Sequence, residues 1–169
     1  MTLSFFVPGK AATAGSKRGF ALKRNGAYTG QVLMTPANPR ERDWKNSVAT
    51  AAFAEKEKLK LDRLILGPVR LDITFIMERP KYHYRGNGSL KANAPELHVC
   101  SPDLTKLLRC AEDALTSVVW SDDSQVATTV VRKRYGTIPG AYVVICEDIE
   151  NNAKNPEPVT KALQPSLAL

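Results

Sequence analysis

The sequence predicts a single α+β domain in which two main helices pack on one face of a mostly antiparallel, mixed sheet. A length of 169 residues and an apolar fraction of 43% suit one globular domain. The predicted elements follow the order strand, strand, strand, helix, strand, helix, strand, strand. We place the domain at residues 1–149 and expect a disordered tail over 150–169, where Asn, Pro and Lys recur without apolar periodicity.

The N-terminal third predicts three strands and a loop. Leu3 to Val7 is a short apolar run and predicts the first strand. Residues 9–19 are small and basic and predict a mobile loop. Residues 20–24 and 28–34 flank Asn25-Gly26, a pair that tolerates the positive φ angles of a type I′ turn, so we expect a β-hairpin.

The middle of the chain predicts a helix, a strand and a long loop. The helix runs from about Arg40 to Leu59 and shows one apolar face, formed by Trp44, Val48, Ala51, Ala52 and Phe53. Val69 to Glu78 alternates apolar and polar residues, as a half-buried strand does. Residues 79–99 are rich in Pro, Gly, Asn and Tyr, and loops of this length are often functional.

The second helix gives the clearest pattern. Ser101 is expected as its N-cap, with Pro102 at the first helical position. Its apolar stripe consists of Leu104, Leu107, Leu108, Ala111, Ala114, Leu115 and Val118. A turn at 121–124 follows, and then two strands, 125–135 and 141–148, which we expect to form a hairpin.

The charge distribution favours a polyanionic partner. The net charge is +7, and the basic side chains are concentrated near the N-terminus. Up to residue 45 the basic residues are Lys10, Lys17, Arg18, Lys23, Arg24, Arg40, Arg42 and Lys45, against the acids Glu41 and Asp43.

Several classes of site are disfavoured. Three scattered cysteines and two histidines, with no Cys-x-x-Cys pair, argue against a disulfide framework, a zinc site or a nucleophilic triad. No phosphate-binding Gly-rich loop, signal peptide or apolar run long enough to span a membrane occurs, so we expect a cytoplasmic protein. Carboxylates remain as candidates: Asp103 begins the second helix, and Asp122-Asp123 follow its far end.

These carboxylates can act together only under one of two conditions. A helix from Asp103 to Val119 would be about 24 Å long. Its two ends can therefore meet only if the chain turns back after Trp120 or if a second protomer supplies one of them. The sequence leaves both alternatives open.

Three motifs resemble the signature of the RusA family of Holliday-junction resolvases. They are Pro102-Asp103-Leu104-Thr105-Lys106-Leu107-Leu108-Arg109, Asp113-Ala114-Leu115 and Asp122-Asp123-Ser124-Gln125-Val126. The family patterns are Pro-Asp-x-Asp-Asn-Leu-x-Lys, Asp-Ala-Leu and Asp-Asp-x-Gln-Val. Phe5 to Gly9 and Lys133 to Gly136 are also similar to family members, so the resemblance spans about residues 3–149.

The resemblance implies a RusA-like fold and a homodimeric, Mg²⁺-dependent endodeoxyribonuclease, with Mn²⁺ as a substitute, that resolves four-way DNA junctions in recombination and repair. Such genes are often associated with phages or prophages. Asp103 and Asp123 match catalytic acids, and Arg109 takes the place of the assisting Lys. The expected metal ligands are Asp103, Asp122 and Asp123. The expected DNA contacts are Lys10, Lys17, Arg18, Lys23, Arg24 and Lys106.

Two departures from the signature support an alternative function. Thr105 replaces the second Asp, and a hydroxyl is a poorer ligand for a hard cation than a carboxylate. Lys106 replaces Asn and adds a positive charge. The alternative is a junction-binding protein that has lost catalysis, with Asp113 or Asp122 as further candidates to compensate. A dimeric interaction protein without a nucleic-acid role is a third hypothesis.

Structural interpretations of the same residues also stand. Asp103 suits the positive end of a helix dipole, and Asp122-Asp123 suit a plain turn. Asp113 is expected to orient a neighbour or form an ion pair, and Trp120 to belong to the core. Tyr82 and Tyr84 could stack on exposed bases or lie in an ordinary polar loop.

Overall fold

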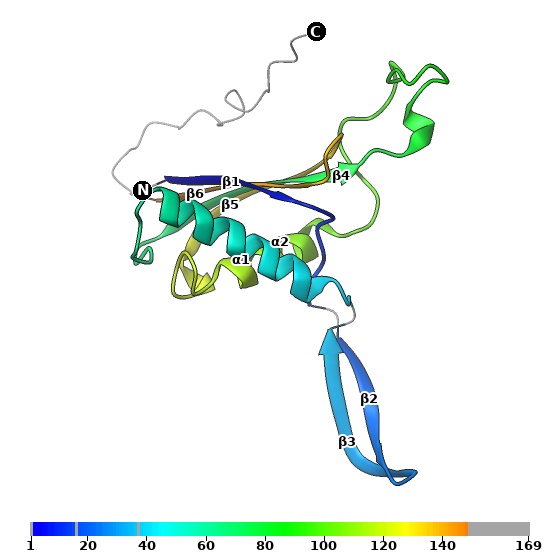
Figure 1. Ribbon diagram of the computed structural model, residues 1–169, viewed down its shortest axis with the longest axis vertical. Helices are drawn as coiled ribbons and strands as arrows, with labels where there is room; N and C mark the ends of the chain where they lie inside the picture. Colours follow the sequence, from blue (N-terminus) through cyan, green and yellow to red (C-terminus); the bar gives the residue numbers. More distant parts are fainter. Residues whose placement is uncertain (1, 16, 37, 149–169) are drawn as a thin grey trace.

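The computed structural model describes residues 2–15, 17–36 and 38–148 and confirms the α+β architecture (Figure 1). Its four-stranded mixed sheet has the order β1-β6-β4-β5. The strands are β1 (Thr2–Pro8), β4 (Val69–Glu78), β5 (Val126–Gly136) and β6 (Gly140–Glu147). Both α1 (Glu41–Lys58) and α2 (Leu104–Leu115) cover one face of this sheet.

The domain boundary predicted at residue 149 and the tail expected over 150–169 lie outside the described residues. Among the residues that are described, no helix combines the length and the apolarity that crossing a bilayer requires.

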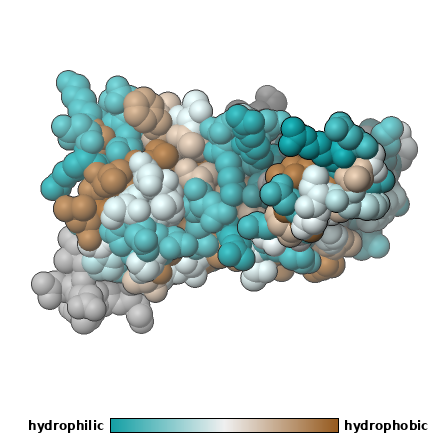
Figure 2. Space-filling view, turned by 90° about the horizontal axis from the view of Figure 1, so that it is seen from below, coloured by the Kyte–Doolittle hydropathy of each residue, from teal (hydrophilic) through white to brown (hydrophobic). Residues whose placement is uncertain are grey.

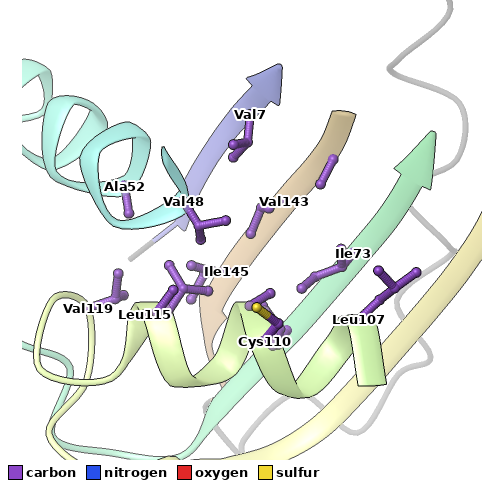
Figure 3. Close-up of a cluster of buried hydrophobic side chains, with 14 of the residues drawn as sticks. Val7, Val48, Ala52, Ile73, Leu107, Cys110, Leu115, Val119, Val143 and Ile145 are labelled. Atoms are coloured by element: carbon purple, nitrogen blue, oxygen red, sulfur yellow. The ribbon is translucent and has the colours of Figure 1, made fainter. Parts of the chain in front are cut away.

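The core lies between the sheet and the two helices (Figure 3). Alternate residues of β4, from Val69 to Phe75, are buried against the helices, as the period of a strand predicts. On α1 the buried positions recur every four residues, at Trp44, Val48 and Ala52. Phe53 was expected on this face and is 58% exposed. It lies about 100° around the helix from Ala52, so this prediction was wrong.

The start of α2 differs from the prediction. The N-cap position is Asp103, and Ser101 and Pro102 precede it, joined by a cis peptide bond. The Lys133 ammonium donates to the carbonyl oxygens of Cys100 and Pro102, at 2.5 Å each. These bonds hold the preceding segment on β5 before the helix begins, so the capping roles expected for Ser101 and Pro102 were wrong.

The end of α2 also comes earlier than expected. The helix stops at Leu115, and Ser117 has a φ of 66°, which ends the helical run before Val118. Trp120 returns to the core with no exposed surface, as expected. The chain therefore turns back directly after the helix.

The two C-terminal strands exist as predicted but do not form a hairpin. β4 lies between them and pairs with β5 in parallel and with β6 in antiparallel orientation. β4 is a long strand with a continuous apolar face, and it pairs along both of its edges from Val69 onward. The connection between β5 and β6 consequently crosses the end of β4.

The predicted N-terminal hairpin is confirmed as a separate two-stranded sheet. β2 (Lys17–Arg24) pairs with β3 (Ala27–Pro36), and the turn between them has positive φ angles at Asn25 and Gly26. Figure 1 shows this hairpin projecting away from the sheet and the helices.

The loop before the hairpin is packed, although the sequence predicted a mobile segment. Ala11, Ala12 and Ala14 are buried. The Ala14 amide donates to the Lys106 carbonyl of α2 at 3.0 Å. The small residues of this stretch therefore serve close packing on α2, which their size permits.

Both histidines help to anchor the long loop over residues 79–99. The rings of His83 and His98 lie 4.9 and 4.7 Å from the Tyr135 ring of β5. Burial lowers the pKa of both histidines. The positive charges of Arg79 and Lys91 lower the pKa of His83 further, and the charge of Lys133 does the same for His98. These residues hold the loop on the sheet.

Candidate functional site

Asp103 lies at the head of α2 with its side chain directed to solvent. Its carboxylate makes no capping hydrogen bond and is 63% exposed. The Lys106 ammonium, one helical turn later, lies 3.2 Å from it. An exposed ion pair of this kind contributes about 1 kcal/mol or less. A cation or a DNA phosphate can therefore compete with it.

The backbone that precedes Asp103 is anchored to β5. Lys133 of β5 donates to the two carbonyls before it, those of Cys100 and Pro102. The His98 amide donates to the Lys133 carbonyl at 3.0 Å. Asp103 thus combines a freely accessible side chain with a fixed main chain.

The exposed face of α2 presents positive charge beside Asp103. Thr105, Lys106 and Arg109 are exposed and follow Asp103 within two turns. A methyl group built on Gly15 would lie 3.4 Å from the Arg109 guanidinium, so the N-terminal loop packs directly against this arginine. The loop and the helix together form one basic surface.

A cavity of about 360 Å³ adjoins the head of α2. Its polar lining includes Lys10, Thr13, Arg40, Glu78, His98 and Ser101. Lys10 pairs with Glu78 at 2.7 Å, and both side chains are more than half exposed. The cavity therefore opens a mixed-charge but mainly basic space next to Asp103.

Asp123 lies at the other end of α2, near Glu112. Burial raises the pKa of the half-buried Glu112, and the charges of Asp123 and Asp113 raise it further, whereas Arg109 lowers it. Asp123 itself is exposed. The far end of the helix is thus an acidic region, in contrast to the basic head.

Asp122 has a structural task in the turn that precedes β5. Its carboxylate accepts the Ser124 amide at 2.9 Å and caps the short 3₁₀ helix Asp123–Gln125. This hydrogen bond lowers the pKa of Asp122. The turn interpretation therefore holds for Asp122, while its role as a metal ligand stays a prediction.

Gln125 fixes the same turn to the rest of the domain. Its side-chain oxygen accepts from the Ser121 and Asp122 amides, and its nitrogen donates to the carbonyls of Ile65 and Gly67. The Gln of the motif Asp-Asp-x-Gln-Val therefore holds the turn against residues 65–67 through hydrogen bonds.

Asp113 forms the ion pair that was one of its expected roles. The Lys45 ammonium of α1 lies 2.8 Å from Asp113 and 3.0 Å from Glu41. Burial alone would lower the pKa of Lys45, but these two carboxylates outweigh it and raise the pKa. Asp113 thereby links α2 to α1.

The cysteines offer no reactive thiol pair. Cys100, Cys110 and Cys146 are all unpaired. Burial raises the pKa of the Cys110 thiol to about 12, so it stays protonated near neutral pH.

One protomer does not unite the predicted acids. Asp103 precedes α2, and Asp123 lies near Glu112, which follows Asp103 by nine residues, or about 14 Å along the helix axis. Over residues 2–15, 17–36 and 38–148, no three or more His, Cys, Asp or Glu side chains form a group that could hold a metal ion. The chain does turn back after Trp120, but this turn leaves Asp123 near Glu112.

The predicted DNA contacts fall into two groups. Lys10 and Lys106 lie on the basic surface around the head of α2. The other four, all exposed, are on β2: Lys17, Arg18, Lys23 and Arg24. Tyr82 is 67% exposed on the long loop, and Tyr84 is half-buried there.

Sequence analysis missed three residues of this region. Lys133 was noted only as part of a motif, and its contacts depend on a long-range meeting of β5 with residues 100–102. Glu112 precedes Asp113 and becomes notable only through its proximity to Asp123. His98 lines the cavity, and only the fold brings it there.

Comparison with known proteins agrees with the motifs. A family model described as "Endodeoxyribonuclease RusA" matches residues 13–146. The chain is 28% identical over 149 residues to "Uncharacterized protein YqaN" of Bacillus subtilis (strain 168). That alignment covers 86% of this chain and 96% of the Bacillus protein.

Proposed function

The chain belongs to the RusA endodeoxyribonuclease family, and we propose from this premise that it cuts four-way DNA junctions as a homodimer in a Mg²⁺-dependent reaction. The single observation that carries the proposal is Asp103: an accessible carboxylate on a fixed backbone, within a basic surface. Such a surface attracts DNA phosphates, and the carboxylate supplies the oxygen ligand that Mg²⁺ prefers.

The donor set suits magnesium bound together with the substrate. Mg²⁺ is usually held by one or two carboxylates plus waters and substrate phosphates, so a complete protein cage is not required. Asp103 would hold the ion at the head of α2. The ion would polarise a phosphate oxygen and make a bound water more acidic.

We propose that the second carboxylate comes from the partner protomer. Because Asp103 and Asp123 lie toward opposite ends of α2, we assign the two carboxylates of one site to different protomers. In a two-fold dimer, each site would combine Asp103 of one protomer with Asp123 of the other. Two such sites are what symmetrical cutting of paired strands requires.

The surrounding cations have separate tasks in this proposal. Arg109, within two turns of Asp103 along α2, would neutralise the charge that builds on the phosphate during cleavage. Lys106 would leave its ion pair with Asp103 and bind a neighbouring phosphate. Lys10 and the cations of β2 would hold the DNA arms. With its three unpaired cysteines, the enzyme would act in the reducing cytoplasm.

A nicking assay on a synthetic four-way junction tests this function. The wild type should cut in Mg²⁺ or Mn²⁺ and be inert in EDTA, and Asp103→Asn and Asp123→Asn should each reduce the cutting rate at least about 100-fold. Asp62→Asn, a surface carboxylate outside the site, is the matched control and should cut normally. An intact junction at every metal concentration would contradict the proposal.

One observation favours a second candidate, a junction-binding protein without catalysis. Lys106 pairs with Asp103 at 3.2 Å, and Thr105 lacks the carboxylate that the family motif has there. If the wild type binds junctions but does not cut them, Thr105→Asp with Lys106→Asn should restore cutting. Failure of this double variant would remove the second candidate.

A further inference from the structure

The β2–β3 hairpin exposes apolar side chains on both of its faces. Its register pairs Phe20 with Leu33 and, one position along, Ala21 with Val32. Successive residues of a strand point to opposite faces, so these two pairs lie on opposite sides of the hairpin. Phe20 is 54% exposed and Val32 61%, and the hairpin stands clear of the sheet and the helices (Figure 1).

Such a hairpin is suited to being covered by a partner. A two-stranded sheet alone is marginally stable in water, because neither face is packed. Grouped apolar side chains on a surface usually mark a binding site. Figure 2, which looks from below towards the hairpin, shows strongly hydrophobic and strongly hydrophilic residues side by side on this face of the molecule.

The charge of the hairpin indicates what that partner is. From residue 17 to residue 36 every charged side chain is basic, and all four are exposed. Lys17 and Arg18 lie at the base, and Lys23 and Arg24 at the tip. A second copy of the hairpin would bring the same charges together and repel it, whereas a polyanion complements them.

DNA provides both features where its base stacking is interrupted. Phosphates match the cations, and an unstacked base pair offers a flat apolar surface on which aromatic side chains stack. Proteins also insert apolar side chains as wedges between bases. At the centre of a four-way junction, the last base pairs of adjacent arms can face an inserted element from both sides.

We propose that the β2–β3 hairpin is a wedge that enters the centre of the junction and stacks Phe20 and Tyr28 on the bases at the crossover. The proposal rests on the proposed function, because it takes branched DNA as the substrate. The Lys23 ammonium lies 4.4 Å from the centre of the Tyr28 ring, so the tip joins an aromatic ring to a phosphate-binding charge. Phe20 with Leu33 and Val32 with Met34 would face different arms.

Through the wedge, the protein would prefer junctions to duplex DNA. An intact duplex has no open stack for the hairpin to enter, so there only the cations contribute. Stacking on one base typically changes affinity by about tenfold. Loss of each aromatic ring should therefore lower the preference for junctions over duplex by about that factor.

A fluorescent base analogue at the crossover tests the wedge without any cutting. The full chain is titrated, in Ca²⁺, onto junctions that carry 2-aminopurine at the crossover or in mid-arm. Fluorescence should rise at the crossover only. Phe20→Ala with Tyr28→Ala should abolish the rise, whereas Phe53→Ala, an equally exposed phenylalanine on α1, should preserve it.

Conservative variants separate stacking from simple apolar contact. Phe20→Tyr should keep the full fluorescence rise and Phe20→Leu should reduce it, because only the former retains a ring at position 20. If the double alanine variant instead converts a DNA-free dimer to monomers in sedimentation experiments, the hairpin belongs to a protein interface and the wedge is overturned.

The outcome is independent of catalysis. Cutting of junctions in Mg²⁺ without unstacking at the crossover overturns the wedge and leaves the nuclease proposal intact. Unstacking without cutting supports the wedge and contradicts the nuclease proposal. A wild type that does not bind junctions, or an unchanged rise in the double variant, also overturns the wedge.

Discussion

The two ends of α2 hold their carboxylates in opposite ways. At the head, Asp103 has an accessible side chain whose contact is an exposed ion pair with Lys106. At the far end, Asp122 caps a turn that Gln125 fastens to residues 65–67, and Glu112 is half-buried beside Asp123. The head is available for a ligand, whereas the far end is mostly committed to holding the fold together.

This difference separates residues that look alike in the sequence. Asp103 and Asp122 both belong to acidic motifs, yet one carboxylate faces solvent and the other is used as a cap. The consequences for mutation are correspondingly different. Apart from those at Asp123, changes at the far end should cost stability, and changes at the head should cost activity.

The largest effect on stability is expected at the far end, from Gln125→Ala. It removes hydrogen bonds to the Ser121 and Asp122 amides and to the carbonyls of Ile65 and Gly67. At about 1 kcal/mol for each bond, and with partial replacement by water, the loss should be about 2–4 kcal/mol. Urea unfolding measures it.

Asn87→Ala is the matched control for that loss. The Asn87 side chain also accepts hydrogen bonds, but from Ser89 within one exposed loop. Its replacement should change the unfolding free energy by less than about 0.5 kcal/mol. Equal losses of unfolding free energy in the two variants would mean that Gln125 stabilises the fold no more than Asn87 does in its exposed loop.

An intermediate effect, mainly on activity, is expected at the head from Lys133→Met. The variant loses the bonds to the Cys100 and Pro102 carbonyls, so the backbone before Asp103 is released. A displacement of about 1 Å can reduce a rate about 100-fold, and junction cutting should fall by that order while binding is retained.

Arg134→Met controls for the loss of a charge on the same strand. Arg134 pairs with Glu96 at the surface. Its variant should cut at close to the wild-type rate. If both variants cut normally, the anchoring of Asp103 by Lys133 has no functional importance.

The smallest effect should come from Glu112→Gln and should depend on pH. The pKa of Glu112 is raised in the folded protein, so its protonated form stabilises the fold below the unfolded pKa, and this contribution is lost as the pH rises. Glutamine keeps the neutral state. The melting temperature of the variant should exceed that of the wild type at about pH 7 and equal it at about pH 3.

Glu57→Gln, on the exposed part of α1, shows how much a general change in net charge contributes. It should leave the melting temperature nearly unchanged at both pH values. A stabilisation by Glu112→Gln that is the same at both pH values would contradict the electrostatic explanation.

The sequence predicted the elements better than their partners. Apolar runs, periodicity and turn residues identified both helices and all six strands, because these signals are local in the chain. It paired β5 with β6, since neighbours in sequence are the simplest partners, and it could not foresee that β4 pairs with both. Strand order depends on contacts far apart in the chain.

The candidate site was predicted as a set of residues rather than as a geometry. Asp103, Asp123 and Arg109 were recognised through motifs, and the family match agrees with those motifs. The separate roles of Asp122 and Asp113 arise from contacts with Ser124 and Lys45, which no local pattern encodes. The packed alanines of the loop before β2 were misjudged because small residues suit both mobile and closely packed segments.

The central claim is that a working site combines Asp103 of one protomer with Asp123 of the other. A heterodimer of Asp103→Asn and Asp123→Asn chains, purified with two different tags, tests it directly in a nicking assay on a four-way junction. If the site is shared, the heterodimer contains one intact site and should nick one strand at about half the wild-type rate per dimer, while both homodimers are inert. A heterodimer as inert as the homodimers, alongside an active wild type, would contradict the claim.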